Sequence, residues 1–372
     1  GDHQGSGRVG GDGVMAKFSE VLTIVNGRNQ KQVVCDDGKY PIYGSGGIMG
    51  YANDYICKAE TVVIGRKGSI NKPIFVETPF WNVDTAFGLC ANSEKLNPKY
   101  LYYFCEKFDF EKLNTTVTIP SLTKSNLLNV EIPLPNLEKQ KQIVELLDKI
   151  TSLISLRKQQ LAKLDELVKA QFANTFENDA NFHTDYMENL SEFVTVGIAN
   201  SATHAYAEHG VVMLRNQNIK ENHLDDTELV YIEPKFADKY KSKKLEANDI
   251  LVTRTGYPGI ACVVPQKYAG SQTFTTLIIR LKKGTNASSC YICHYINSSH
   301  GKKYVSGTKV GVAQQNFGAK VLAKMPVIVP PIELQNQFAT FVARIDQQKQ
   351  TVQQSLEKLE LMKKALMQEY FG

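Results

Sequence analysis

Three short stretches of the chain carry residue types at spacings that could do chemistry. Residues 40–51, "YPIYGSGGIMGY", are glycine-rich like a loop whose backbone N–H groups cradle a phosphate. Residues 290–294, "CYICH", have the C-x-x-C-H spacing of covalent haem attachment and offer ligands to zinc. Residues 97–100, "NPKY", are close to the N-P-P-Y motif of amino-methyltransferases. Nucleotide, metal and methyl-transfer chemistry are therefore the classes to weigh first.

Each of these patterns is better explained as structure. Met49 stands where G-x-G-x-x-G requires its last glycine, and no Lys-Ser/Thr pair follows, so the glycine stretch predicts a tight turn rather than a nucleotide site. "CYICH" has no second Cys/His pair at ligand spacing and lies in a predicted helix. "NPKY" lacks one proline and predicts a helix cap. No G-x-S-x-G or H-E-x-x-H pattern appears, so the sequence nominates no catalytic residue.

Composition predicts a cytoplasmic protein of at least two domains. The chain has 372 residues, of which 42% are hydrophobic, and this length is more than one hydrophobic core ordinarily accommodates. Seven scattered cysteines are typical of reduced thiols, and no apolar run approaches the ~18 residues of a membrane span. The net charge of +5 tolerates a polyanionic partner without requiring one. Residues 1–14 are Gly-rich without apolar periodicity, and we interpret them as an expression remnant.

The chain contains an internal duplication. The segment from Asn136 aligns without a gap on the segment from Pro331. Further upstream, "TVVIGRKGSI" from Thr61 resembles "DILVTRTGYP" from Asp249. The matched pairs include Pro135 with Pro330, Glu138 with Glu333, Gln140 with Gln335, Gln142 with Gln337, Phe176 with Phe371, Arg66 with Arg254 and Gly68 with Gly256. Each half is therefore predicted to be a globular segment followed by a long helix.

The two long helices are predicted to pair with each other. Their apolar residues step by threes and fours, as in a coiled-coil seam, and their equal lengths favour pairing over the alternative that each helix lies on its own domain. The predicted pairing residues are Ile143, Leu147, Ile150, Leu161 and Leu164 in the first helix and Phe338, Val342, Ile345, Leu356 and Leu359 in the second. The globular segments have short β-branched runs such as "TVVIG" and "TLIIRL", which predict strand-rich α/β (α+β) domains.

A family resemblance rests on "IPSLTKSNLLNVEIPLPNLEKQKQIVELLDKI", on the "YPIYGSGGIMGY" and "VVIGRKGSI" that precede it, and on the recurrence of its proline–glutamine junction one domain later. This pattern resembles the specificity subunit of type I restriction-modification systems, known as HsdS. The second junction, "VPPIELQNQF", lacks the basic residue usual before the second glutamine, and the second domain has no "YPIYGSGG".

The resemblance implies both an architecture and a set of partners. Target recognition domains at residues 15–135 and 178–330 would be separated by antiparallel coiled-coil helices at 136–177 and 331–372, related by a pseudo-twofold. Each domain would read half of a bipartite target in double-stranded DNA. The helices would dock two modification subunits, which restriction subunits join. S-adenosylmethionine and ATP with Mg²⁺ would belong to those partners, so no cofactor is expected in this chain and it would be non-catalytic.

Candidate DNA contacts are the turn glycines and the polar and basic residues of predicted loops. Backbone N–H groups and Lys/Arg bind phosphates, whereas Arg, Asn and Gln read base edges. Taken singly, each is more often a solvated loop residue, and only Arg66 and Arg254 recur in both halves. The set is Ser45, Gly46, Gly47, Arg66, Lys67, Arg215, Asn216, Gln217, Asn218, Arg254, Thr255, Tyr257, Lys302, Lys303, Gln314, Gln315 and Asn316.

Two other classes of function remain as alternatives to DNA recognition. A protein-interaction scaffold would bind no DNA with or without a methyltransferase partner. A self-sufficient DNA methyltransferase would methylate DNA as a purified chain, although the missing catalytic and cofactor motifs argue against this class.

Overall fold

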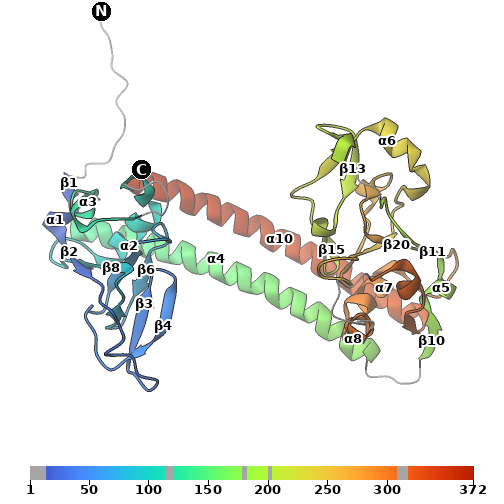
Figure 1. Cartoon of the computed structure of the whole chain (residues 1–372), viewed down its shortest axis with the longest axis horizontal. Coiled ribbons are helices and arrows are strands. Elements are labelled where there is room, and N and C mark those ends of the chain that lie inside the picture. Colours follow the sequence, from blue (N-terminus) through green and yellow to red (C-terminus); the bar gives the residue numbers. More distant parts are fainter. Residues whose placement is uncertain (1–13, 114–120, 178–181, 200–202, 308–316) are drawn as a thin grey trace, which may run out of the picture. The chain divides into compact units, whose positions relative to one another are not determined.

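The computed structural model describes residues 14–113, 121–177, 182–199, 203–307 and 317–372 (Figure 1). The chain forms two compact units, one holding the chain up to Gln159 together with Val352–Gly372 and the other holding Gln160–Thr351. Each unit contains one strand-rich domain, one part of α4 (Leu137–Phe172) and one part of α10 (Ile332–Phe371). The predicted mixed α/β class is confirmed. Among the described helices, none is long and apolar enough to cross a membrane.

The first domain is built on two small sheets and a strand pair that joins its ends. An antiparallel sheet has the order β2-β8-β5-β6, and a second sheet has the order β4-β3-β7 with β3 and β7 parallel. β1 pairs with β9, and Val14 already belongs to this pair opposite Leu134, one residue before the predicted start of the domain. The elements are β1 (Val14–Lys17), α1 (Phe18–Val21), β2 (Leu22–Asn26), β3 (Tyr40–Gly44), β4 (Gly47–Ala52), β5 (Thr61–Gly65), β6 (Ile74–Val76), β7 (Trp81–Asn82), β8 (Ala86–Ala91), α2 (Pro98–Lys107), α3 (Lys124–Leu128) and β9 (Glu131–Leu134).

The second domain repeats this plan. Its main sheet has the order β11-β20-β17-β18, its second sheet has the order β12-β16-β13-β19, and β13 and β19 are again parallel. β10 pairs with β21, as β1 does with β9. The elements are β10 (His183–Tyr186), α5 (Met187–Leu190), β11 (Ser191–Val196), β12 (Tyr206–Ala207), β13 (Val211–Leu214), β14 (Ile219–Lys220), β15 (His223–Leu224), β16 (Val230–Ile232), α6 (Pro234–Lys239), β17 (Ile250–Val252), β18 (Ala261–Val263), β19 (Gln272–Thr273), β20 (Leu277–Leu281), α7 (Ser289–Asn297), α8 (Ser299–Gly307), α9 (Ala319–Ala323) and β21 (Pro326–Val329).

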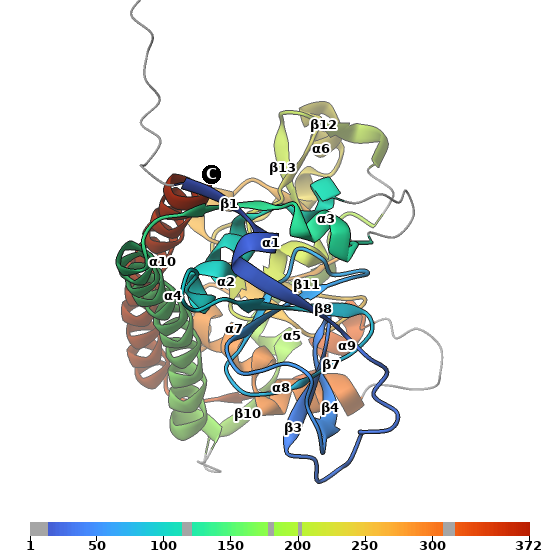
Figure 2. The same cartoon turned by 90° about the vertical axis from the view of Figure 1, so that its left-hand side faces the viewer.

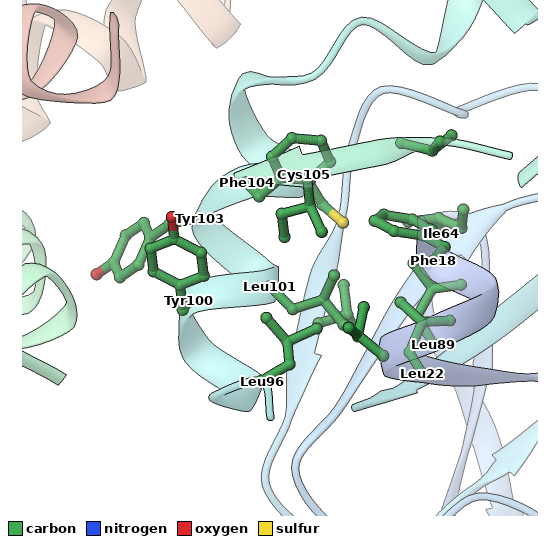
Figure 3. Packing of buried hydrophobic residues seen from close by; sticks show 14 of the residues in the cluster. Phe18, Leu22, Ile64, Leu89, Leu96, Tyr100, Leu101, Tyr103, Phe104 and Cys105 are labelled. Carbon is green, nitrogen blue, oxygen red and sulfur yellow. The ribbon is translucent and has the colours of Figure 1, made fainter. Parts of the chain in front are cut away.

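Helix α2 supplies much of the first core. It starts where the "NPKY" pattern predicts a cap, because the side chain of Asn97 accepts hydrogen bonds from the backbone N–H groups of Lys99 and Tyr100. Figure 3 shows the α2 side chains packed toward the main sheet and α1, where the rings of Phe18 and Phe104 meet edge to face with centroids 5.7 Å apart. Tyr100 and Tyr103 project from another side of the same helix. One face of helix α2 therefore packs on the sheet, and the face with Tyr100 and Tyr103 is turned toward other elements of the same unit.

A buried glutamine ties the start of each long helix to its own domain. In the first unit, Gln140 is fully buried and donates to the carbonyls of Lys95 (3.0 Å) and Pro135 (2.8 Å), while its Oε1 accepts from the N–H of Asn97 (2.8 Å). In the second unit, Gln335 makes the same three bonds with the carbonyls of Asn286 and Pro330 and the N–H of Ser288. Asn97 and Ser288 are the N-cap residues of α2 and α7. The identity of these two glutamines in the duplication is thus explained by one shared set of bonds.

The far end of each long helix packs on a tyrosine. Phe371, near the end of α10, lies 5.0 Å from Tyr100 of α2 between ring centroids. Phe176, in the π-helical turn that follows α4, lies 4.9 Å from Tyr291 of α7. These contacts repeat the alignment of Phe176 with Phe371, so the pseudo-symmetry extends from the sheets to the helix ends.

Helices α4 and α10 pack together in antiparallel fashion, as predicted. In the first unit, Arg157 Nε donates to Ser355 Oγ (3.3 Å), and Met367 joins Ile143 and Leu147 in one core. In the second unit, Lys349 pairs with Asp165 (2.6 Å). The alternative that each helix lies on its own domain also proves to be partly true, because helix-end residues merge into the domain cores. Of the predicted pairing residues, Ile143, Leu147, Phe338 and Ile345 lie in domain cores, Ile150 and Leu356 are buried outside those cores, and Leu161, Leu164, Val342 and Leu359 are half-buried.

Candidate nucleic-acid interface

The loops that follow β5 and β17 share a left-handed glycine at the same position. β5 and β17 occupy the same place in the two main sheets, and each is followed by the aligned arginine, Arg66 or Arg254. Two residues later, Gly68 has φ +79° and Gly256 has φ +75°, a left-handed conformation that only glycine adopts at low cost. The predicted alignment of "GRKGS" with "TRTGY" is therefore supported by the place of the strands and by this glycine.

The glycine turn of the first domain has a counterpart that the sequence hides. β3 and β13 are each the strand that pairs in parallel with a short partner, at Ile42 opposite Trp81 and at Met213 opposite Gln272. The turn after β3, beginning at Ser45, is thus equivalent to the loop after β13, residues 215–218. The second domain lacks the "YPIYGSGG" residues but keeps the strand and the loop.

In each domain these two loops lie side by side. A Cβ placed on Gly65, the last residue of β5, would lie 3.0 Å from the Cβ of Ser45. In the second domain, Asn216 Nδ2 donates to Thr255 Oγ1 at 2.8 Å. The structure thereby brings together predicted contact residues that are separated in sequence. A duplicated pair of adjoining loops is the candidate interface.

The glycine stretch is a β-hairpin turn, which confirms the turn prediction and removes the phosphate-loop alternative. β3 and β4 pair antiparallel around it, so a strand follows the turn where a phosphate loop needs a helix. Gly47 has φ +117°, and a Cβ on Gly46 or Gly47 would meet no heavy atom of the described residues within 4 Å. The turn therefore leaves room for another molecule close to its backbone.

Arg66 is exposed and held by its backbone and by an aromatic ring. Its N–H donates to the carbonyl of Thr85, and its carbonyl accepts from the N–H of Leu122. Its guanidinium lies 5.7 Å from the centroid of the Phe87 ring, which orients the side chain by a cation–π contact. The adjacent Lys67 is also exposed. Phe87 was not predicted, because its position beside Arg66 depends on the pairing of β5 with β8.

Arg254 has a different environment. Its side chain is half-buried, and its Nε is enclosed without a hydrogen-bond partner in the described part of the chain. Tyr257 in the same loop is 85% exposed, while its carbonyl accepts from Thr253 Oγ1 at 2.6 Å. A buried donor without a partner costs free energy unless a ligand or water satisfies it. Arg254 is accordingly available for a further acceptor.

Three residues predicted as contacts make hydrogen bonds within their own loop. Asn218 is 2% exposed and donates to the carbonyls of Asp225 and Glu228, while its Oδ1 accepts from the N–H of Arg215. Arg215 Nη2 donates to the Glu228 carbonyl at 3.0 Å, and Gln217 pairs with the Glu228 carboxylate at 3.1 Å. Arg215 and Asn218 thus position the loop, and Asn216 is the member that reaches toward Thr255.

Lys302 and Lys303 lie on helix α8 rather than in the predicted loop. Lys302 is paired with Glu221 (2.7 Å), which is also paired with Lys169 of α4 (2.8 Å). Burial opposes ionisation of Glu221, but the two lysines outweigh it and keep its pKa below the ordinary value. Lys303 is exposed. Gln314, Gln315 and Asn316 lie outside the described residues.

The "CYICH" residues lie in a helix, as predicted, and all of them except the half-buried Cys290 are buried. They lie in α7, where burial raises the pKa of the Cys293 thiol and lowers the pKa of His294 to about 4, with a smaller effect from the charge of Lys349. His294 stacks on Phe172 and meets Phe338 edge to face. Across the described ranges, no group of three or more His, Cys, Asp or Glu side chains is arranged to hold a metal ion.

Comparison with known proteins identifies the family. The family described as type I restriction modification DNA specificity domain matches residues 12–166 and 184–361. The chain belongs to this specificity family. It is 22% identical over 88% of its length to a putative type I restriction enzyme specificity subunit of Haemophilus influenzae, of which it covers 86%. It is 21% identical over 96% of its length to the MjaVIII specificity subunit of Methanocaldococcus jannaschii, of which it covers 82%.

Solved structures of specificity subunits have the same fold. The type I S subunit from M. genitalium superposes with a TM-score of 0.63 at 14% identity and covers 98% of both chains. A chain from work on complex assembly and conformational transition of the type I R-M system gives 0.61 at 13% identity, with 98% of this chain and 99% of that chain covered. The two matched family segments correspond to the two halves of the duplication, so each half carries one specificity domain and one adjoining long helix.

Proposed function

We propose that this specificity subunit binds double-stranded DNA through the adjoining loops after β3 and β5 in the first domain and after β13 and β17 in the second. The duplicated loop pair carries the proposal, because two equivalent surfaces suit two halves of a bipartite target. The recognition domains would comprise residues 15–135 and 178–330. Basic and amide side chains at strand ends are suited to phosphates and base edges.

Catalysis would belong to partner subunits. The relatives are described as specificity subunits of type I restriction enzymes, a role defined within a larger enzyme. We propose that two modification subunits dock on α4 and α10 and supply S-adenosylmethionine-dependent methyl transfer. Restriction subunits would add ATP- and Mg²⁺-dependent cleavage, and the complex would act in the cytoplasm. In this division of labour the chain holds no cofactor and selects the DNA that its partners modify.

Arg66→Ala and Arg254→Ala should each damage recognition of a different half-site. If each arginine contacts a base edge, discrimination at one position should fall by about 1 to 3 kcal/mol. The measurement is competition binding of the full chain with its modification subunits on targets substituted at one base pair at a time. Lys283→Ala changes an exposed basic residue after β20, at the end of the main sheet away from Arg254, and as the control it should leave both half-sites unchanged. Equal loss on every sequence would assign the residue to phosphate contact, and loss at both half-sites would contradict the assignment of one domain to each.

The affinity for DNA should be strongly salt-dependent and should rise when the modification subunits are added. The net charge of +5 is modest, so the partners are expected to supply much of the phosphate contact. For six or more phosphate contacts, affinity should fall by about three orders of magnitude between 50 and 200 mM salt. Titrations of the chain alone and of the complex test this. Tight binding by the isolated chain that does not change with salt would exclude an electrostatic interface.

A further inference from the structure

The tip of the β3–β4 hairpin in the first domain exposes two large apolar side chains. Ile48 is 54% exposed and Met49 is 63% exposed, although both lie within β4. A β-bulge leaves Met49 unpaired between Ile48, opposite Tyr43, and Gly50, opposite Ile42, and both side chains stay exposed. In Figures 1 and 2 the hairpin lies at the end of the domain opposite α1 and α3. Only β3 and β4 extend past Asn82 of β7, which is opposite Tyr43, so the hairpin ends as a two-stranded ribbon at the edge of this sheet.

Single exposed apolar residues are ordinary, but this pair has a specific setting. Met49 lies across Gly44, where a Cβ would come within 2.6 Å of its Sδ, so the thioether lies close against the backbone of β3. The turn beside the pair contains Ser45, which lies next to Gly65, the residue before Arg66. The apolar tip and the exposed guanidinium consequently belong to one surface.

A ribbon with these properties fits the major groove of DNA. The groove admits a two-stranded β-ribbon, and the open space around Gly46 and Gly47 lets the backbone approach closely. The 5-methyl group of thymine is the apolar feature that this groove displays. The equivalent loop of the second domain carries Asn216 and Gln217, which are polar. The two domains thus present different chemistry at the same place.

We propose that Ile48 and Met49 contact thymine methyl groups and make the first domain select A·T pairs at that position of its half-site. This inference rests on the proposed DNA-binding function and adds the chemical feature that is read. Arg66 would hold the neighbouring base or phosphate while the hairpin tip lies against the methyl groups.

Deoxyuridine substitution isolates the methyl group. In the full chain assembled with its modification subunits, each thymine of the first half-site is replaced in turn by deoxyuridine, which removes the methyl and keeps base pairing. At one thymine or more, the unsubstituted protein should bind about fourfold more weakly, the equivalent of ~0.8 kcal/mol for one buried methyl. In Ile48→Ser and Met49→Ser variants the same substitution should have a smaller effect or none. Binding to the thymine-containing target should itself weaken severalfold in these variants.

The controls separate the outcomes. Val34→Ser changes a side chain that is 55% exposed beside Ala52, at the other end of the hairpin, and should preserve the deoxyuridine effect. Deoxyuridine in the second half-site should act equally on all variants. Specific binding with no deoxyuridine effect, or a first half-site without an A·T pair, would overturn the methyl-reading proposal alone. Absence of sequence-specific binding by the complex would instead overturn the proposed function.

Discussion

Replacing Gln140 with alanine should lower the free energy of unfolding of the first unit by about 3 kcal/mol. The substitution removes three partly buried hydrogen bonds and takes this partner from one backbone N–H and two carbonyls, each loss costing up to about 1 to 3 kcal/mol before water or relaxation reduces the sum. The N–H belongs to the cap of α2, so the start of that helix loses support together with the start of α4. Gln335→Ala should act by the same amount on the second unit, because its three bonds are equivalent.

The matched controls are Gln142 and Gln337, which lie two residues further along each helix and are exposed. Their alanine variants should change stability by less than about 0.5 kcal/mol. Urea unfolding followed by domain-specific probes measures the effect. Gln140→Glu is informative as well, because a carboxylate at neutral pH can accept from the Asn97 N–H but cannot donate to the two carbonyls. Equal stability of the Gln140 and Gln142 alanine variants would show that the buried bonds are not needed.

The large-scale architecture was accessible from the sequence because it depends on periodicity and repetition. The long helices follow from apolar residues at steps of three and four, and the duplication marked Gln140 and Gln335 as equivalent before their bonds were known. Arg66 and Arg254 could also be matched, because Gly68 and Gly256 impose the same left-handed turn after both strands. Sequence patterns along the chain therefore predicted the equivalence of the loops after β5 and β17, which form half of the candidate interface.

The remainder of the interface depends on pairing between distant strands. Ser45 and Arg215 share no sequence signal, yet they follow equivalent strands because β3 and β13 each take a parallel partner from far along the chain. The same limit applies to Asn218. Its residue type suggests a contact to a base edge, but its side-chain amide donates to carbonyls in its own loop. The sequence likewise offers Lys302 as a candidate DNA contact, whereas in the structure its ammonium group forms a salt bridge with Glu221.

The helix seam shows how a correct pattern can have two uses. A periodic apolar stripe does not specify what covers it. Ile150 and Leu356 are buried outside the domain cores, whereas Ile143 and Phe338, in the same stripes, continue into the domain cores. The apolar stripe correctly predicted that the helices pair. It could not show which residues pack into the domain cores, because helix pairing and packing on a domain bury the same side of the helix.

The stability of the second unit should decrease below pH 6.5 because of His294. Burial lowers the pKa of this imidazole from 6.5 to about 4 in the folded state, so the unfolded chain binds a proton more readily. The sign follows from that difference. Above pH 6.5 the imidazole is neutral in both the folded and the unfolded chain, so His294 does not change the free energy of unfolding. Between pH 6.5 and 4 only the unfolded state is protonated, so stability falls as the pH falls, by about 2 kcal/mol at pH 5 and about 3 kcal/mol at pH 4.

The neighbouring charges make a difference measurement necessary. Lys349 lowers the pKa of His294 further, and Asp346, on the same face of α10, has a pKa raised by burial, which shifts stability in the opposite direction as the pH falls. The His294→Phe variant keeps an aromatic ring against Phe172 and Phe338 and removes only the titrating group. Subtracting its unfolding free energies at pH 4.5 to 8 from those of the unsubstituted chain should therefore give a curve that is flat above pH 7 and declines by about 1.36 kcal/mol per pH unit toward pH 5. A flat difference over the whole range would mean that His294 binds its proton equally well folded and unfolded, and the enclosure of this side chain between α4, α7 and α10 would then be wrong.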